Sequence, residues 1–306
     1  MKIILAFDSF KNCLSSPEIC TVLSGSIQEL RPDWQIVQLP LGDGGEGTAR
    51  AITSALGGSM QKCTVHDPLF RIIEADFGLL PDNTAVLEMA SASGIELITR
   101  SERDPLRTTT YGTGEMLKYL SQVKNVRSFI ICIGGSATVD CGIGLLQALG
   151  VEFFDGNDQL LPVPANAYDI AKIRRINAKN IPDAIRKSRI CIASDVTNPL
   201  CGENGAARIF APQKGADASA VEFLENNLEK FGTLSVESGL ADSITVPGDG
   251  AAGGLGFALR NYLHAETTSG AELVLNILDF DKHLDNAGWV ITGEGCSDFQ
   301  TAHGKL

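Results

Sequence analysis

The feature that most constrains the fold is the segment 130–150, which reads as a strand, a tight glycine turn and a helix. Four residues with the character of a buried strand, 130–133, run directly into Gly134-Gly135. The leucines at 145, 146 and 149 then recur at helical spacing. A buried strand that feeds a helix through a short turn is typical of a parallel sheet covered on both faces, so we predict an α/β protein.

The glycine turn is itself suited to bind an anion. Ser136, Thr138 and Asp140 follow the two glycines, so small hydroxyls and backbone N–H groups gather at the carboxyl edge of the sheet. The positive end of the helix dipole lies at the same point, which favours a phosphate group above all. A structural turn, in which the glycines serve only close packing, explains the same residues.

Composition bounds the class of protein. A chain of 306 residues suffices for two ordinary domains, and 37 acidic against 25 basic residues give a net charge of −12. An acidic chain with no basic run argues against a nucleic acid or an anionic membrane as the partner, so we expect small-molecule substrates. A homo-oligomer is compatible with these numbers.

Cysteine and histidine usage points to an intracellular protein without a metal cluster. The eight cysteines include no C-x-x-C pair, and the four histidines lack the spacing of metal ligands. Reduced, mostly structural thiols are typical of the cytoplasm, which is where we expect this protein.

Two further glycine-rich segments, 42–47 and 248–253, match the pattern G-x-G-x-x-G of dinucleotide-binding enzymes. An NAD-dependent oxidoreductase is therefore an alternative interpretation. It is not favoured, because Asp43 and Glu46 lie inside the first loop and would repel a pyrophosphate. Carboxylates beside a helix N-terminus are better placed for Mg²⁺, for a substrate hydroxyl or for helix capping.

Polar residues also follow two other predicted strands. Asp8, Ser9 and Lys11 come after the first apolar strand of the chain, and Asp195 comes after a later buried strand. Enzymes with an α/β fold place catalytic groups in loops at the carboxyl ends of strands. Arg107 and the hydroxyls after it could face the same site. Solvated loops and helix caps explain these residues equally well.

Taken together, these loops closely resemble one family, the bacterial glycerate kinases that make 2-phosphoglycerate. The resemblance covers essentially the whole chain, and it is specific because many short motifs occur in the same order. The motifs are D-S-F-K at 8–11, D-G-G-E-G-T at 43–48, T-T-Y-G-T-G-E at 109–115, G-G-S-A-T at 134–138, G-I-G-L-L-Q-A-L-G at 142–150, D-V-T-N-P-L at 195–200, P-Q-K-G at 212–215, G-A-A-G-G-L-G at 250–256 and T-G-E-G at 292–295.

The resemblance implies two α/β domains, a flavodoxin-like (Rossmann-like) domain built from both ends of the chain and a second α/β domain inserted into it. We place the split domain at 1–70 plus 285–306 and the inserted domain at 71–284. The site is then expected in the cleft between the two domains.

The same resemblance implies a reaction in which ATP phosphorylates D-glycerate to 2-phospho-D-glycerate with Mg²⁺ as cofactor. Phosphoryl transfer requires donors, cations and metal to converge on the transferred group. The roles expected are catalysis by Asp195, Lys214 and Lys11; glycerate binding by Asp8, Ser9, Lys11, Arg107 and Asn198; binding of ATP phosphates by Gly134, Gly135, Ser136, Thr138, Lys214, Gly253 and Gly254; and Mg²⁺ binding by Asp43, Glu46 and Glu294.

The sequence departs from the family pattern near its end. An arginine usually follows T-G-E-G in the family, where this chain has Cys296, and family members continue with further strand–helix units. A last strand at 289–292, in a sheet expected to be covered on both faces, likewise predicts further elements after it, so we expect the chain to end inside a domain. The alternative interpretation is a truncated, catalytically impaired glycerate-kinase-like protein that binds phosphate or nucleotide.

Overall fold

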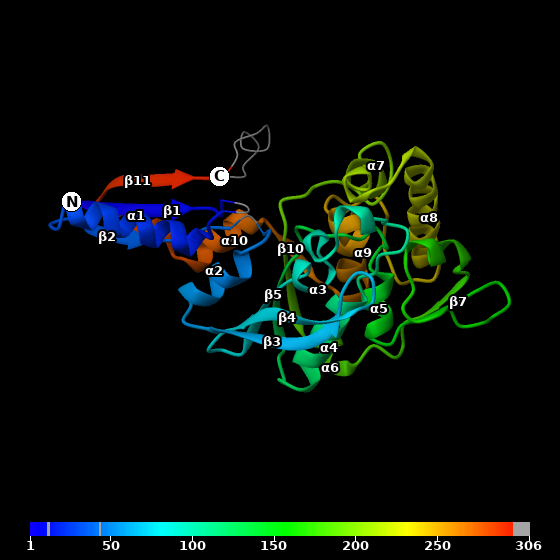
Figure 1. The fold of residues 1–306 in the computed structure, drawn as a ribbon. Helices are drawn as coiled ribbons and strands as arrows, with labels where there is room; N and C mark the ends of the chain where they lie inside the picture. The colour runs from blue at the N-terminus through cyan, green and yellow to red at the C-terminus, as the bar shows by residue number, and fades with distance from the viewer. Residues whose placement is uncertain (11–12, 43, 296–306) are drawn as a thin grey trace.

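The computed structural model describes residues 1–10, 13–42 and 44–295, and these form two main sheets and a two-stranded one, with helices packed on them (Figure 1). The sheets are mostly parallel, which confirms the α/β prediction. In the part of the chain that the structure describes, we find no helix both long and apolar enough to cross a membrane.

The smaller sheet joins the beginning of the chain to its last described strand. It has the order β11-β1-β2, with all three strands parallel. The strands are β1 (Lys2–Phe7), β2 (Gln35–Gln38) and β11 (Ala287–Gly293). Two segments far apart in the sequence therefore lie side by side, as the blue and red arrows of Figure 1 show.

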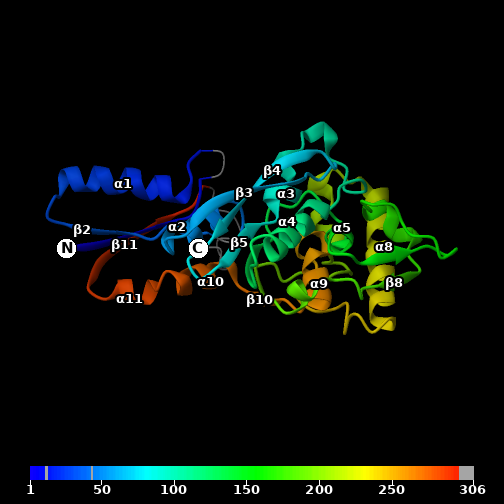
Figure 2. The same ribbon diagram turned by 90° about the horizontal axis from the view of Figure 1, so that it is seen from below.

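Both faces of β1 are covered, because residues 3–7 are all apolar and successive side chains point to opposite faces, whereas the edge strand β11 is largely exposed. Ile3 and Leu5 pack against α1 (Ser16–Leu30), whereas Ile4 and Ala6 pack towards α2 (Thr48–Ala55) and α10 (Gly270–Ile277). Figure 2 shows α1 on one side of the sheet and α10 with α11 (Phe280–Leu284) on the other. A capping box of Ser15 and Glu18, together with a proline in the first turn, fixes the start of α1.

The larger sheet has six strands in the order β10-β9-β6-β5-β4-β3. Strands β5, β6, β9 and β10 are parallel, and β3, β4 and β5 form an antiparallel meander. The strands are β3 (Ser59–His66), β4 (Ile72–Leu79), β5 (Thr84–Glu88), β6 (Ser128–Cys132), β9 (Arg189–Ala193) and β10 (Glu266–Thr268). A separate pair is formed by β7 (Glu152–Phe154) and β8 (Arg175–Asn177).

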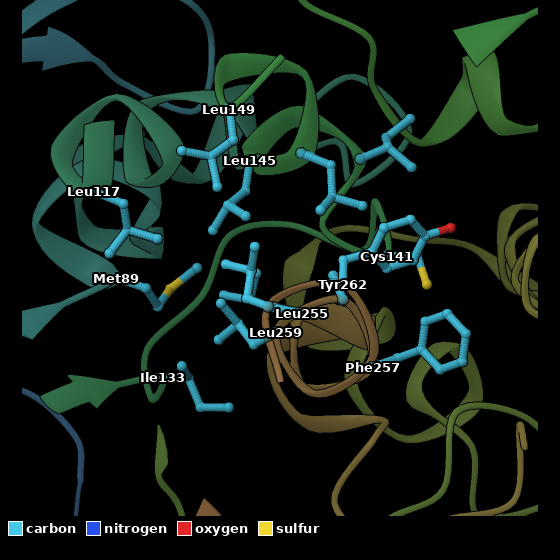
Figure 3. Close-up of a cluster of buried hydrophobic side chains, with 14 of the residues drawn as sticks. Met89, Leu117, Ile133, Cys141, Leu145, Leu149, Leu255, Phe257, Leu259 and Tyr262 are labelled. Atoms are coloured by element: carbon cyan, nitrogen blue, oxygen red, sulfur yellow. The ribbon is translucent and has the colours of Figure 1, made fainter. Parts of the chain in front are cut away.

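Helices and short 3₁₀ turns connect these strands. The α-helices are α3 (Ala90–Ser93), α4 (Tyr111–Gln122), α5 (Ile143–Ala148), α6 (Asp183–Arg186), α7 (Ala206–Phe210), α8 (Ala218–Glu237) and α9 (Ala251–Leu263). The 3₁₀ turns are η1 (Ile95–Leu97), η2 (Arg100–Glu102), η3 (Ala167–Lys172) and η4 (Pro212–Lys214). Leucines of α4, α5 and α9 meet in the largest apolar core (Figure 3).

The segment 130–150 has the predicted form of a strand, a turn and a helix. Gly142 and Gly144 in this segment, and Gly253 opposite it, are explained by close packing. A Cβ at Gly144 would lie 2.1 Å from Oγ1 of Thr109, and a Cβ at Gly253 of α9 would lie 2.1 Å from the carbonyl oxygen of Thr138. The long turn after β6 is therefore enclosed by α4 on one side and α9 on the other.

The chain passes from one sheet to the other at positions that differ from the predicted domain boundaries. Strand β3 lies inside the segment 1–70, yet it pairs along its whole length with β4 of the larger sheet. Val274 of α10 lies inside the segment 71–284, yet it packs in the apolar cluster of β1. The chain therefore leaves the smaller sheet before β3 and returns to it after β10, and the division into two domains stays a prediction.

Candidate active site at the edge of the larger sheet

A cavity of about 750 Å³ lies where the glycine-rich loop before α2 meets the larger sheet. Its walls come from this loop, from α2, from the ends of three parallel strands and from the segment 90–97. The described lining residues are Ser15, Gly44, Gly45, Glu46, Gly47, Ala49, Arg50, Met60, Asp76, Glu88, Ala90, Ser91, Gly94, Ile95, Glu96, Leu97, Gly134, Gly135, Ser194, Asp195 and Val196.

The larger sheet brings the carboxyl ends of three strands to the same edge. Strands β5, β6 and β9 are parallel neighbours, and Glu88, Cys132 and Ala193 are paired in register at their carboxyl ends. Gly134, which comes shortly after β6, and Asp195, which comes shortly after β9, therefore emerge at the same edge. This edge is where open α/β sheets bind ligands.

The glycines at this edge allow two backbones to touch. Gly44 has φ +83°, and a Cβ there would lie 2.7 Å from the carbonyl oxygen of Ala193. A Cβ at Gly134 would lie 2.8 Å from the Cα of Gly45, and the N–H of Gly134 donates to the carbonyl oxygen of Gly44 over 3.3 Å. The loop before α2 is thus pressed against the ends of β6 and β9, and it closes one side of the cavity.

Glu88 is a cavity residue that the sequence analysis did not single out. Its Oε1 accepts the N–H of Ala49 over 2.8 Å, and the N–H of Gly47 also donates to this carboxylate. The pKa of Glu88 is raised to about 7, mainly by burial and in part by the charge of Glu46, while the two backbone donors and Arg50 oppose the shift. Glu88 is the last residue of a buried strand, and Asp195 comes shortly after one. The expectation that catalytic acids lie at the carboxyl ends of buried strands, which singled out Asp195, therefore also points to Glu88.

Asp195 lies in the cavity wall, at the position the sequence predicted for a strand-end acid. Its Oδ1 accepts a hydrogen bond from the hydroxyl of Ser269 over 2.6 Å and one from the N–H of Gly270 over 3.1 Å. These donors belong to the first turn of α10. Asp195 therefore also attaches α10 to the end of β9.

Lys214 stands behind the glycine turn, with only 2% of its surface exposed. Its ammonium group donates to the hydroxyl of Ser136 over 2.6 Å and to the carbonyl oxygen of Thr138 over 2.7 Å. Burial lowers the pKa of Lys214 to about 7, and the buried carboxylate of Asp140 opposes that shift. The structure thus brings three predicted residues together, next to Gly134-Gly135.

Several other residues predicted for the site lie away from the cavity. Arg107 is 80% exposed and pairs with Asp104 over 3.4 Å, and the Asn198 side chain donates to the carbonyl oxygen of Asn204. Gly253 and Gly254 are buried against the segment 138–141. Asp8 and Ser9 follow β1, and Glu294 follows β11. None of these described residues lines the cavity, and their roles stay predictions.

Glu46 is the one predicted Mg²⁺ ligand that the structure describes in the cavity wall. Lys11, Asp43 and Cys296 lie outside the described residues. Within 1–10, 13–42 and 44–295, no group of three or more His, Cys, Asp or Glu side chains is arranged to hold a metal ion.

The fold and the cavity define an α/β protein whose candidate site lies where parallel strands end, beside a glycine-rich loop. Residues 3–306 match the model of the glycerate kinase family, and the chain belongs to that family.

Named relatives resemble the chain over its whole length. The chain is 41% identical to the glycerate 2-kinase of Escherichia coli K12, with 100% of this chain and 80% of that protein covered. It is 39% identical to the glycerate kinase of Bacillus subtilis 168, with 100% and 79% covered. The crystal structure of a candidate glycerate kinase 2 from Salmonella typhimurium LT2 superposes with a TM-score of 0.90 at 39% identity, covering 100% of this chain and 81% of that one.

Proposed function

We propose that this protein is an ATP-dependent glycerate kinase, which transfers the γ-phosphoryl group of MgATP to D-glycerate and releases ADP and 2-phospho-D-glycerate. One observation carries the proposal: the glycine turn Gly134-Gly135 stands between two carboxylates, Glu88 and Asp195, at the ligand-binding edge of a parallel sheet. The family and the names of the relatives support the same reaction.

This geometry suits phosphoryl transfer, because such catalysis consists mostly of positioning and electrostatic stabilisation. Without side chains, Gly134 and Gly135 let a phosphate approach the backbone closely. Arg50 brings a positive charge to the cavity, where it pairs with Asp76 over 3.5 Å. Lys214 fixes the loop after the turn through Ser136.

Mg²⁺ enters this proposal as part of the MgATP substrate. Mg²⁺ is commonly bound by one or two carboxylates together with substrate phosphates, so a site of three protein ligands is not required. The carboxylates in the cavity wall have the right chemistry for such contacts, and we assign none of them as a ligand.

A dinucleotide is a poor fit to the segment 42–47. The carboxylate of Glu88 already accepts the N–H groups at the start of α2, where a pyrophosphate would otherwise bind. The second match, 248–253, ends at Gly253, which is buried against the backbone of Thr138. Both matches therefore have structural explanations.

The test is an assay of ADP release with MgATP and D-glycerate, with the product identified by phosphorus NMR. We expect ADP release that depends on glycerate, and a signal of 2-phosphoglycerate. The matched control omits glycerate. Saturable ATP binding with no glycerate-dependent turnover would reject the kinase and favour the phosphate- or nucleotide-binding alternative.

We expect the enzyme to act in the cytoplasm, where ATP is available. Cys13, Cys20, Cys63, Cys141, Cys191 and Cys201 are free thiols, as a reducing compartment would keep them. Oligomeric assembly stays a prediction, which light scattering of the purified chain tests.

A further inference from the structure

The cavity holds two strand-end carboxylates, and the structure distinguishes their surroundings. We infer that Glu88 is the residue that accepts the proton of the attacking glycerate hydroxyl. The inference rests on the proposed kinase function and adds to it one catalytic residue, which neither the motifs nor the relatives' names identify.

The sheet places Glu88 and Asp195 on opposite sides of the glycine turn. Glu88 ends β5, Asp195 follows β9, and β6 with Gly134-Gly135 lies between them. Neighbouring strands are about 4.8 Å apart, so β5 and β9 run roughly 10 Å from each other, on either side of β6. A phosphoryl group bound over the glycines would therefore have one carboxylate on either side.

Asp195 is committed to the fold. The hydroxyl of Ser269 and the N–H of Gly270 both donate to the same oxygen, Oδ1, and thereby hold the first turn of α10 against the larger sheet. Glu88 likewise accepts two N–H groups, from Gly47 and Ala49, so the two carboxylates differ in their burial and in the charges around them.

Glu88 is held in place and is suited to take up a proton. The N–H groups of Gly47 and Ala49 orient its carboxylate from the start of α2. The charged groups around it are Glu46 in the loop before α2, Arg50 on α2 with its partner Asp76 on β4, and Asp195 across the turn. With a pKa of about 7, this carboxyl changes protonation state near neutral pH, which suits a general base.

The phosphoryl transfer needs only MgATP, glycerate and the Glu88 carboxylate. The hydroxyl oxygen of glycerate forms a bond to the γ-phosphorus while the bond from that phosphorus to the β–γ bridging oxygen breaks. The electron pair of the broken bond leaves with ADP. The hydroxyl proton passes to the Glu88 carboxylate, which returns it to solvent after the products leave.

The first test is Glu88→Gln, which keeps a side-chain oxygen for the N–H of Ala49 but cannot take up the proton. We expect kcat to fall by about 10²–10⁴-fold, with KM for ATP and for glycerate changed by only a few-fold. Glu74→Gln is the matched control, because Glu74 is exposed on β4 and bonded to Thr64 outside the cavity. It should retain full turnover and the native melting temperature.

The second test is the pH dependence of kcat, measured first on the unmodified protein. In the unmodified protein, kcat should fall about tenfold per pH unit below the pKa of the base, and Glu88→Gln should lack this dependence. A kcat that is flat from pH 5.5 to 8, or full turnover in a folded Glu88→Gln, would overturn the role of Glu88 and leave the kinase function standing. Absence of turnover in the unmodified protein would overturn both.

Discussion

The ammonium group of Lys214 lies 2.6 Å from the hydroxyl of Ser136, a residue 78 positions earlier in the chain. The same group donates to the carbonyl oxygen of Thr138, so one buried side chain holds two points of the loop that follows the glycine turn. We therefore expect Lys214 to position the candidate phosphate site from behind the cavity wall.

The variant Lys214→Met removes this attachment while keeping most of the side-chain volume. Because Ser136 and Thr138 lose their partner in a buried place, we expect the free energy of unfolding to fall by about 1–3 kcal/mol. We also expect a lower kcat/KM for ATP, because the glycine turn is less well fixed. Urea unfolding and steady-state kinetics measure both effects.

Lys187→Met is the matched control for this variant. Lys187 is 75% exposed, and its partner Asp183 is exposed as well, so its removal should change stability by less than about 0.5 kcal/mol. If Lys214→Met unfolds like the control and keeps its kcat/KM, the positioning role is refuted.

Glu88 should make stability depend on pH. Its pKa rises from 4.5 to about 7 on folding, so the stability contributed by the protonated form is complete below pH 4.5 and is lost as pH rises through 7. Relative to the unmodified protein, Glu88→Gln should gain stability between pH 5 and pH 8, by up to roughly 3 kcal/mol at about 1.4 kcal/mol per pKa unit. Urea unfolding at the two pH values measures this, and a pH-independent difference would contradict it.

Gly134→Ala should damage both the fold and the site. The added Cβ would lie 2.8 Å from the Cα of Gly45, so the loop before α2 must move away from the end of β6. We expect a loss of about 1–3 kcal/mol in the free energy of unfolding and a strong loss of turnover.

Gly25→Ala is the opposite case. A Cβ at Gly25, in the middle of α1, meets nothing within 4 Å, so this variant should gain about 0.5–1 kcal/mol through helix propensity and keep its turnover. Thermal melting and the ADP-release assay compare the two variants. Equal behaviour would show that the backbone contact at Gly134 does not matter.

Asp195→Asn tests the role predicted for Asp195 from its place in the sequence. The amide oxygen can still accept from Ser269 and Gly270, so α10 should stay attached. We expect this variant to retain more turnover than Glu88→Gln, whereas Asp195→Ala should loosen α10 and cost about 1–2 kcal/mol of stability. A larger loss of kcat in Asp195→Asn than in Glu88→Gln would restore Asp195 as the proton acceptor.

Local patterns in the sequence predict much of this fold. The apolar run 130–133 and the leucines after it predict β6 and α5, because burial on one side of an element leaves a period in the chain. Ser15 and Glu18 mark the start of α1, because a helix end needs partners for its free N–H groups. The ordered motifs identify the family, which the match over 3–306 confirms.

The candidate site was only partly predictable. A strand-end acid at 195 and a glycine turn at 134–135 follow from rules about neighbouring residues, and the structure places both in the cavity wall. Such local rules do not predict which strands become neighbours in the sheet. Glu88 joins the site because β5 pairs with β6, a choice made by packing across the whole sheet.

The sequence by itself determined the class of fold, the family and the local turns, because these depend on residues close together in the chain. Only the tertiary structure decided that Glu88 meets the start of α2, that Lys214 is buried behind Ser136, and that Gly253 packs on the backbone of Thr138. The physical reason is that burial and hydrogen bonding between distant segments depend on the order of strands and on the volume available between them.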